Sequence, residues 1–178
     1  MTMLTPSITQ DDVTTALRSF LLSILPPGVE VFIGQANRVP EPADDNFIVM
    51  TPNTRARLAT TAMSWDHADP NAASLDWSEP TKIDVQLDIH GEGGTDNAQV
   101  IQTLFRSSYA CDQMAASGLT PLYCDDGQQV PFINGENQYE DRWIINAVMQ
   151  ATPVVSTAQQ FADTLTVGVI EVDATYPP

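Results

Sequence analysis

The chain has 178 residues, with 23 acidic side chains against 7 basic ones and a formal net charge of −16. Its hydrophobic fraction of 43% is ordinary for a protein that buries a core, so length and composition predict one folded domain over residues 1–178 and exclude disorder as the default. The basic residues form no run in the sequence, which argues against the phosphate-binding surface of a specific nucleic-acid binder.

The first twelve residues lack the basic and apolar regions of a signal peptide, and no apolar stretch approaches the roughly 20 residues of a membrane helix. We therefore expect a soluble protein that is made in the cytosol and has no membrane partner. Cys111 and Cys124 are too few for a disulfide framework, and neither has a metal-finger partner. Two free thiols are expected.

The first predicted element is a helix. Thr9 is a good N-cap residue, and Asp12 stands three residues later, as in a capping box. From Val13 to Ile24 apolar residues recur at the i, i+3, i+4, i+7 spacing of one buried face. The run Pro26-Pro27-Gly28 ends the helix because proline cannot continue it.

Strands are predicted next, near residues 29–33, 46–50 and 55–65, the last with weak alternation. The clearest strand is 82–90, where apolar and polar residues alternate strictly. One face of this strand is therefore expected to be buried and the other to be exposed to solvent. The buried set is Ile83, Val85, Leu87 and Ile89.

A second helix is predicted after the glycine turn at 91–94, with Thr95 as its cap. Its apolar stripe includes Cys111, which we interpret as a core residue. The full stripe is Ala98, Ile101, Leu104, Phe105, Ser108 and Cys111.

The remaining strands are predicted at 119–124, 142–150 and 161–173. Residues 142–150 carry apolar side chains on both faces, which favours a central position in the sheet. Residues 64–80 and 125–138 are predicted to be long loops. The order of elements predicts an α+β fold, with a mostly antiparallel sheet of about five to seven strands and two helices packed on one face.

Catalytic and ligand-binding motifs are not found. The glycine cluster 91–94 lacks the lysine and hydroxyl residue of a phosphate loop. His67 and His90 are interpreted as exposed, solvated histidines, and the Asp125-Asp126-Gly127 run as a turn. We predict no catalytic residue, cofactor or metal site, because no set of residues has the spacing that such chemistry needs.

Aromatic residues in the predicted loops are candidates for subunit contacts, with core packing an equal alternative. Scarce positive charges in so acidic a chain are also expected to find acidic partners, some across an interface. The predicted interface residues are Trp65, Trp77, Phe132, Glu136, Tyr139, Arg55, Arg57 and Arg142.

Several segments give the chain a resemblance to the neck or tail-terminator-like proteins of tailed bacteriophages. The most specific segment is residues 131–143, Pro-Phe-Ile-Asn-Gly-Glu-Asn-Gln-Tyr-Glu-Asp-Arg-Trp. The resemblance covers most of the chain and includes no catalytic motif. The other segments are 8–13, 25–31, 34–40, 48–52, 57–60, 81–88 and 121–126.

The resemblance implies a structural virion protein and not an enzyme. It implies a homo-oligomeric ring, typically a hexamer, that caps the tail tube, stops its polymerisation and contacts the head–tail connector or stopper protein. DNA would pass through the lumen. The alternatives are a tail tube protein or tail assembly factor, and less favoured, a small hydrolase that uses His67 or His90.

Overall fold

The computed structural model describes residues 4–35, 42, 45–66, 73–133, 139–159 and 166–168. For Phe132 and Glu140 it describes the backbone and not the side chain. Its main sheet has the strand order β1-β2-β5-β10-β6, and the short β7 also pairs with β10. Only β1 and β2 run parallel within this described sheet, and the other neighbours are antiparallel. The bounds are β1 (Glu30–Ile33), β2 (Phe47–Arg57), β5 (Thr81–His90), β6 (Leu119–Cys124), β7 (Gln128–Gln129) and β10 (Arg142–Ala151).

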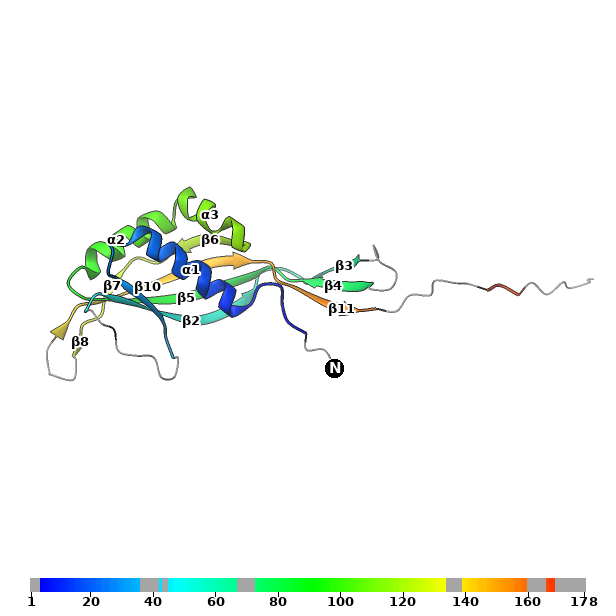
Figure 1. The fold of residues 1–178 in the computed structure, drawn as a ribbon, viewed down its shortest axis with the longest axis horizontal. Helices are drawn as coiled ribbons and strands as arrows, with labels where there is room; N and C mark the ends of the chain where they lie inside the picture. Colours follow the sequence, from blue (N-terminus) through cyan, green and yellow to red (C-terminus); the bar gives the residue numbers. More distant parts are fainter. Residues whose placement is uncertain are drawn as a thin grey trace, which may run out of the picture.

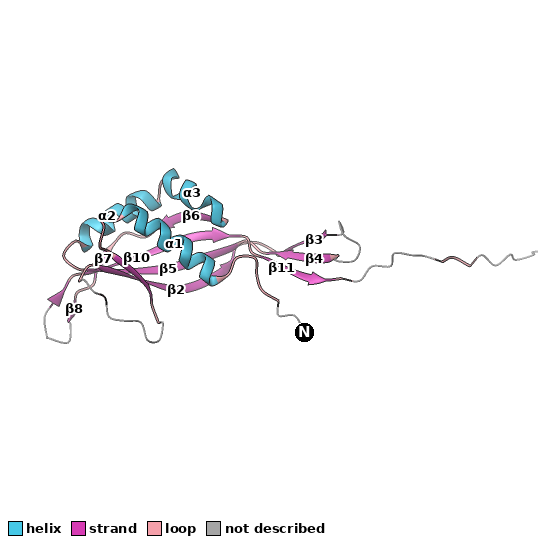
Figure 2. Ribbon diagram, viewed as in Figure 1, coloured by secondary structure: helices cyan, strands magenta, loops and turns pink. Residues whose placement is uncertain are grey.

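Helices cover one face of this sheet (Figures 1 and 2). They are α1 (Gln10–Ile24), α2 (Gly94–Phe105) and α3 (Ser108–Met114), and the 3-10 turn η1 (Ala115–Ser117) follows α3. The predicted α+β class and the helix-covered antiparallel sheet are therefore confirmed. The central position predicted for the strand at 142–150 is confirmed too, because β10 lies between β5 and β6.

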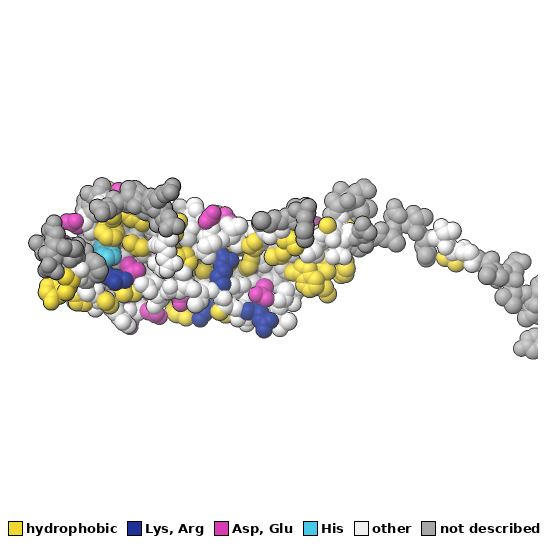
Figure 3. Space-filling model, turned by 90° about the horizontal axis from the view of Figure 1, so that it is seen from below, with side chains coloured by type: hydrophobic (Ala, Val, Ile, Leu, Met, Phe, Trp, Pro, Cys, Tyr) yellow, Lys and Arg dark blue, Asp and Glu magenta, His cyan; other side chains and the backbone are white. Residues whose placement is uncertain are grey.

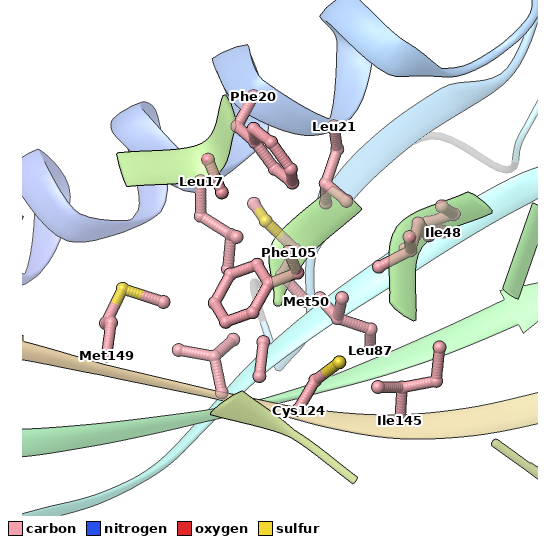
Figure 4. Close-up of a cluster of buried hydrophobic side chains, with 14 of the residues drawn as sticks. Leu17, Phe20, Leu21, Ile48, Met50, Leu87, Phe105, Cys124, Ile145 and Met149 are labelled. Carbon is pink, nitrogen blue, oxygen red and sulfur yellow. The ribbon is translucent and has the colours of Figure 1, made fainter. Parts of the chain in front are cut away.

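The core lies between the helices and the sheet (Figure 4). The odd-numbered residues of β5 from Ile83 to Ile89 are at most 1% exposed, as their alternation predicts. Phe20 of α1 meets Phe105 of α2 edge to face, with ring centroids 5.9 Å apart. Full burial of each such side chain contributes about 1.5–3 kcal/mol to folding, so this layer is the main source of stability.

Helix α1 begins where the sequence predicts. The Thr9 hydroxyl accepts a hydrogen bond from the backbone N–H of Asp12 at 3.2 Å, and the Asp12 carboxylate accepts from the Thr9 backbone N–H at 2.8 Å. Both halves of the predicted capping box are thus formed. Leu25 is the C-cap residue, directly before the two prolines.

The second helical segment differs from the prediction. Gly93 is the N-cap of α2 and makes no side-chain cap, so the predicted cap at Thr95 is wrong. The helix ends at Phe105, and an extended Ser107 turns the chain before α3 begins. The break changes the helical phase, so Cys111 is exposed and the interpretation of Cys111 as a core residue is wrong.

Three further strands form a second sheet in the order β11-β4-β3, named here the distal sheet. It lies beyond the helices at one end of the molecule (Figure 1). Part of the loop predicted at 64–80 is therefore strand, and the strand predicted at 55–65 divides between the end of β2 and β3. The bounds are β3 (Ala62–Asp66), β4 (Ser74–Ser78) and β11 (Val154–Ala158).

The opposite end of the molecule carries the hairpin of β8 (Phe132–Ile133) and β9 (Tyr139–Glu140). The predicted loop 125–138 thus contains the short strands β7 and β8. For the strand predicted at 161–173, residues 166–168 are not in a strand, and the rest lies outside the described residues. No helix in the described part of the chain is long and apolar enough to span a membrane.

Candidate assembly surfaces

The distal sheet continues three strands of the main sheet. β2 leads into β3, β4 leads into β5, and β10 leads into β11. Ala151 lies opposite Thr81 in the main sheet, and Val154 lies opposite Ser78 in the distal sheet. Two residues lie between these pairs on each strand, so no residue is skipped or inserted. β4–β5 and β10–β11 therefore form one continuous antiparallel ladder.

This continuity explains why one face of the distal sheet is apolar. Side chains alternate along a strand, so Trp77 falls on the same side of the ladder as Ile83, and Val155 on the same side as Met149. The pattern that makes one face of the main sheet a core face thus runs on past the end of the helices. The second face carries small and polar residues: Ala62, Ser64, Asp66, Ser74, Asp76, Ser78, Val154, Ser156 and Ala158.

Large side chains on the apolar face are exposed, except that of Leu75, which is buried. Met63, Trp77 and Val155 lie directly opposite one another across the three strands, and Trp65 lies in the next row, opposite Leu75. The exposed fraction is 57% for Met63, 54% for Trp65 and 40% for Trp77. Hydrophobic side chains gather at this end of the described surface in Figure 3. A clustered apolar patch of this kind is typical of an interaction surface.

Positive charges adjoin this patch. Arg57 lies opposite Thr81, next to the pair of Ala56 and Lys82, at the ends of β2 and β5 that lead into the distal sheet. Arg55 precedes them on β2, and its Nε donates to Gln10 Oε1 at 3.3 Å. Among the described residues the ion pairs are Arg106–Asp126 and Arg142–Asp88, so neither Arg57 nor Lys82 has an acidic partner there.

The opposite end of the molecule carries a second apolar patch with acidic neighbours. Ile133 and Tyr139 lie opposite each other in the β8–β9 hairpin and are 54% and 80% exposed. Close by, the Gly91 N–H donates to the backbone oxygen of Asp141, which brings the 91–94 turn to the start of β10. The acids here are all exposed: Glu92, Asp96 and Asp141.

Arg142 finds its acidic partner in its own chain. Its guanidinium donates to Asp88 Oδ1 from Nη2 at 2.6 Å and from Nε at 3.0 Å, and Asp88 is 6% exposed. On the same strand, His90 stacks on Phe47 with ring centroids 4.4 Å apart. The interpretation of His90 as an exposed, solvated histidine is therefore wrong, because the aromatic neighbour half-buries it.

The acidic turn at 125–126 has structural contacts. Asp126 accepts from Arg106 at 2.8 Å, and Asp125 accepts from Asn146 at 3.1 Å. The hydrogen bond with Asp126 raises the pKa of Arg106, and burial raises the pKa of the Cys124 thiol. No group of three or more potential metal ligands occurs among the described residues.

The predicted interface residues are thus placed at both ends of the molecule. Trp65, Trp77, Arg55 and Arg57 lie at the distal end, and Tyr139 lies in the hairpin at the other end. His67, Glu136 and the side chain of Phe132 lie outside the described residues. Sequence reasoning missed Met63, Val155 and Ile133. The two-residue spacing of Met63 and Trp65 is the signal that could have placed both on one exposed strand face.

Comparison with known proteins yields a family and distant structural likenesses. No curated protein matches the chain. Among solved structures, the sheath/tube terminator of an extracellular contractile injection system aligns with a TM-score of 0.47 and 16% identity. The alignment covers 94% of this chain and 64% of that chain. The sequence profile of the phage neck terminator protein matches residues 11–177, and the chain therefore belongs to that family.

Proposed function

We propose that copies of this chain form a closed ring, typically a hexamer, on the head-proximal end of the phage tail tube. Membership of the family makes the protein a structural component of the phage neck and a tail terminator. The finer role proposed here is that the ring stops polymerisation of the tube protein and joins the tube to the head–tail connector. The DNA then passes through the lumen of the ring.

One observation beyond the family supports assembly most directly. Three strands leave the helix-covered core and expose the apolar face with Met63, Trp65 and Trp77. Exposed apolar side chains gain free energy when a partner covers them, at about 25 cal/mol per Å² removed from water. A subunit that remained alone would leave this surface in water, so its exposure favours a role in an assembly.

The acidity of the chain fits a ring through which DNA moves. A net charge of −16 disfavours adhesion of a polyanion to the lumen wall. A protein that holds DNA in place would instead need clustered cations. This reasoning supports passage of DNA rather than binding of DNA as the role of the ring.

The proposal is tested with particles assembled in the absence of the protein. We expect tails of uncontrolled, excessive length that fail to join heads, and restoration of normal length when the protein is supplied. Electron micrographs of negatively stained particles measure both. Tails of normal length joined to heads in its absence would contradict the proposal.

The same particles separate the proposal from the two structural alternatives. A terminator is present in one ring per mature particle. A tube protein is present in many copies along the tail, and an assembly factor is absent from the mature particle. Quantitative mass spectrometry of purified particles gives the copy number, and native mass spectrometry of the isolated protein gives the size of any ring that it forms alone.

A further inference from the structure

The two ends of the subunit are complementary in both charge and apolar character. At the distal end, Arg55 and Arg57 lie on the same side of the ladder as the apolar face, and Lys82 lies at the same end on the other side. These are three of the seven cations of the chain. At the opposite end, Ile133 and Tyr139 lie near exposed carboxylates. We propose that the distal end of one copy docks on the β8–β9 end of the next copy. This inference rests on the proposed ring and specifies which of its surfaces meet.

The two ends of the subunit differ in charge. Among the described residues, the distal end holds the acids Asp66, Asp76 and Glu79 beside its three cations, so it is near charge balance. The opposite end holds Glu92, Asp96 and Asp141, all exposed. Two acidic surfaces of this chain repel each other, whereas the near-neutral distal end, which contains three cations, meets the acidic β8–β9 end without that repulsion.

The distal end has cations that are not paired within the described part of the chain. Arg57 is exposed, Lys82 is half-buried, and neither has an acidic partner among the described residues. By contrast, Arg106 and Arg142 are both paired within the chain. A second copy supplies exposed carboxylates at a site that also has an apolar surface, which is the combination that the distal end requires.

The symmetry of a ring requires two different contact surfaces on each subunit. A patch that docked on itself would give a closed two-fold dimer, whereas a ring of more copies needs two different patches on each subunit. The distal sheet and the β8–β9 hairpin lie at opposite ends of the molecule (Figure 1), so one subunit can contact two neighbours at once. Both apolar patches are then covered in every copy of the ring.

Cross-linking in assembled particles tests the contact. In a background with Cys111→Ser, which removes the exposed thiol, Met63→Cys and Ile133→Cys are placed on the same chain. A bis-maleimide should join successive copies into a ladder of cross-linked multimers. Met63→Cys alone should give no ladder. The matched control pairs Met63→Cys with Leu122→Cys, which is exposed at 41% on β6, away from both ends, and should give none either.

A charge exchange tests the same contact while both apolar patches stay intact. The double variant Arg57→Glu and Lys82→Glu should lose incorporation into particles at least tenfold, and so should Glu92→Lys with Asp141→Lys. Combining all four changes in one chain should restore incorporation, because the attraction is re-formed with reversed signs. Asp112→Lys, an exposed charge on α3, is the control and should leave incorporation unchanged. If a cysteine variant is not incorporated into particles, the charge exchange still tests the contact.

The outcomes separate this contact from the ring itself. Ladders of this chain alone, together with rescue by the fourfold charge exchange, support the contact. Three outcomes would overturn the contact, even if tails lacking the protein are overlong. The first is a dimer from Met63→Cys alone, and the second is a cross-link from residue 63 to another particle protein. The third is failure of the fourfold charge exchange to restore incorporation. Normal tails without the protein would overturn the proposed function and this contact together.

Discussion

The main sheet and the distal sheet contain continuous strands, yet their apolar residues have different environments. In the main sheet, Leu87 and Ile145 are at most 1% exposed because helices cover them. In the distal sheet, Trp65 and Trp77 continue the same kind of alternation with 54% and 40% exposure. The comparison shows that strand alternation predicts which side chains share a face, but the cover over that face decides whether they are buried.

The largest effect of a single substitution is expected in the core of the main sheet. Leu87→Ala should lower the free energy of unfolding by about 2–5 kcal/mol, because it removes buried atoms and leaves a cavity under the helices. Urea titration of the isolated protein measures the change. A loss below about 1 kcal/mol would show that the core relaxes around the cavity and that the main sheet is less tightly packed than described.

The matching change in the distal sheet should act on assembly. Trp65→Ala and Trp77→Ala should each cost at least roughly 1–2 kcal/mol of association while the melting temperature of the subunit changes little. Thermal unfolding and incorporation into particles are measured on the same variants. Unfolding of both variants at the permissive temperature would instead assign the tryptophans to the subunit's own core.

A smaller effect is expected at the capping box of α1. Thr9→Ala should cost about 0.5–2 kcal/mol, because the Asp12 backbone N–H loses its acceptor and the Asp12 carboxylate loses the hydroxyl donor. Hydrogen bonds from Thr9 lower the pKa of Asp12, so the charged cap stabilises the fold above the ordinary carboxyl pKa. That contribution is lost as the pH falls through the lowered pKa.

The pH dependence has a direct control. Asp12→Asn should remove the part of the acid destabilisation that is due to this cap, and unfolding curves at neutral and acidic pH measure it. If Asp12→Asn and the unchanged protein lose stability in parallel on acidification, then the cap carboxylate is not the group that titrates.

The smallest effect concerns the two thiols. Cys111 is exposed and should react with a maleimide in the native protein, whereas Cys124 is buried and its raised pKa keeps it as a thiol. Modification of Cys111 should leave stability nearly unchanged. Mass spectrometry after labelling should show one modification in native protein and two after unfolding. Two rapid native modifications would show that β6 opens readily.

The sequence predicted the elements that rest on local rules. The capping box at Thr9, the alternation from Ile83 to Ile89 and the two-sided apolar pattern of β10 all follow from spacing alone. These features placed the helix-covered sheet correctly, and the resemblance identified the family that the profile match confirms.

The remaining features depend on contacts between distant residues. Strand β3 has five exposed residues, and it forms a strand because Ala62 to Asp66 pair with β4. The break at Ser107 is not marked by glycine or proline, so the helical stripe predicted to continue to Cys111 gave the wrong phase. The pairing of Arg142 with Asp88 joins two strands that are 54 residues apart. Local periodicity contains no information on such partners.

The continuous ladder of β4–β5 with β10–β11 also has a geometric consequence. From Arg142 to Ala158 it extends over roughly 50 Å at about 3.3 Å per residue, and the two proposed docking surfaces lie near its opposite ends. The angle between those surfaces is therefore set by the twist and coil of one β-ribbon. In a closed ring that angle fixes the curvature, so the number of subunits depends on the length of this ribbon. Lengthening both strands by two residues would preserve side-chain alternation, yet it would change the diameter at which the ring closes.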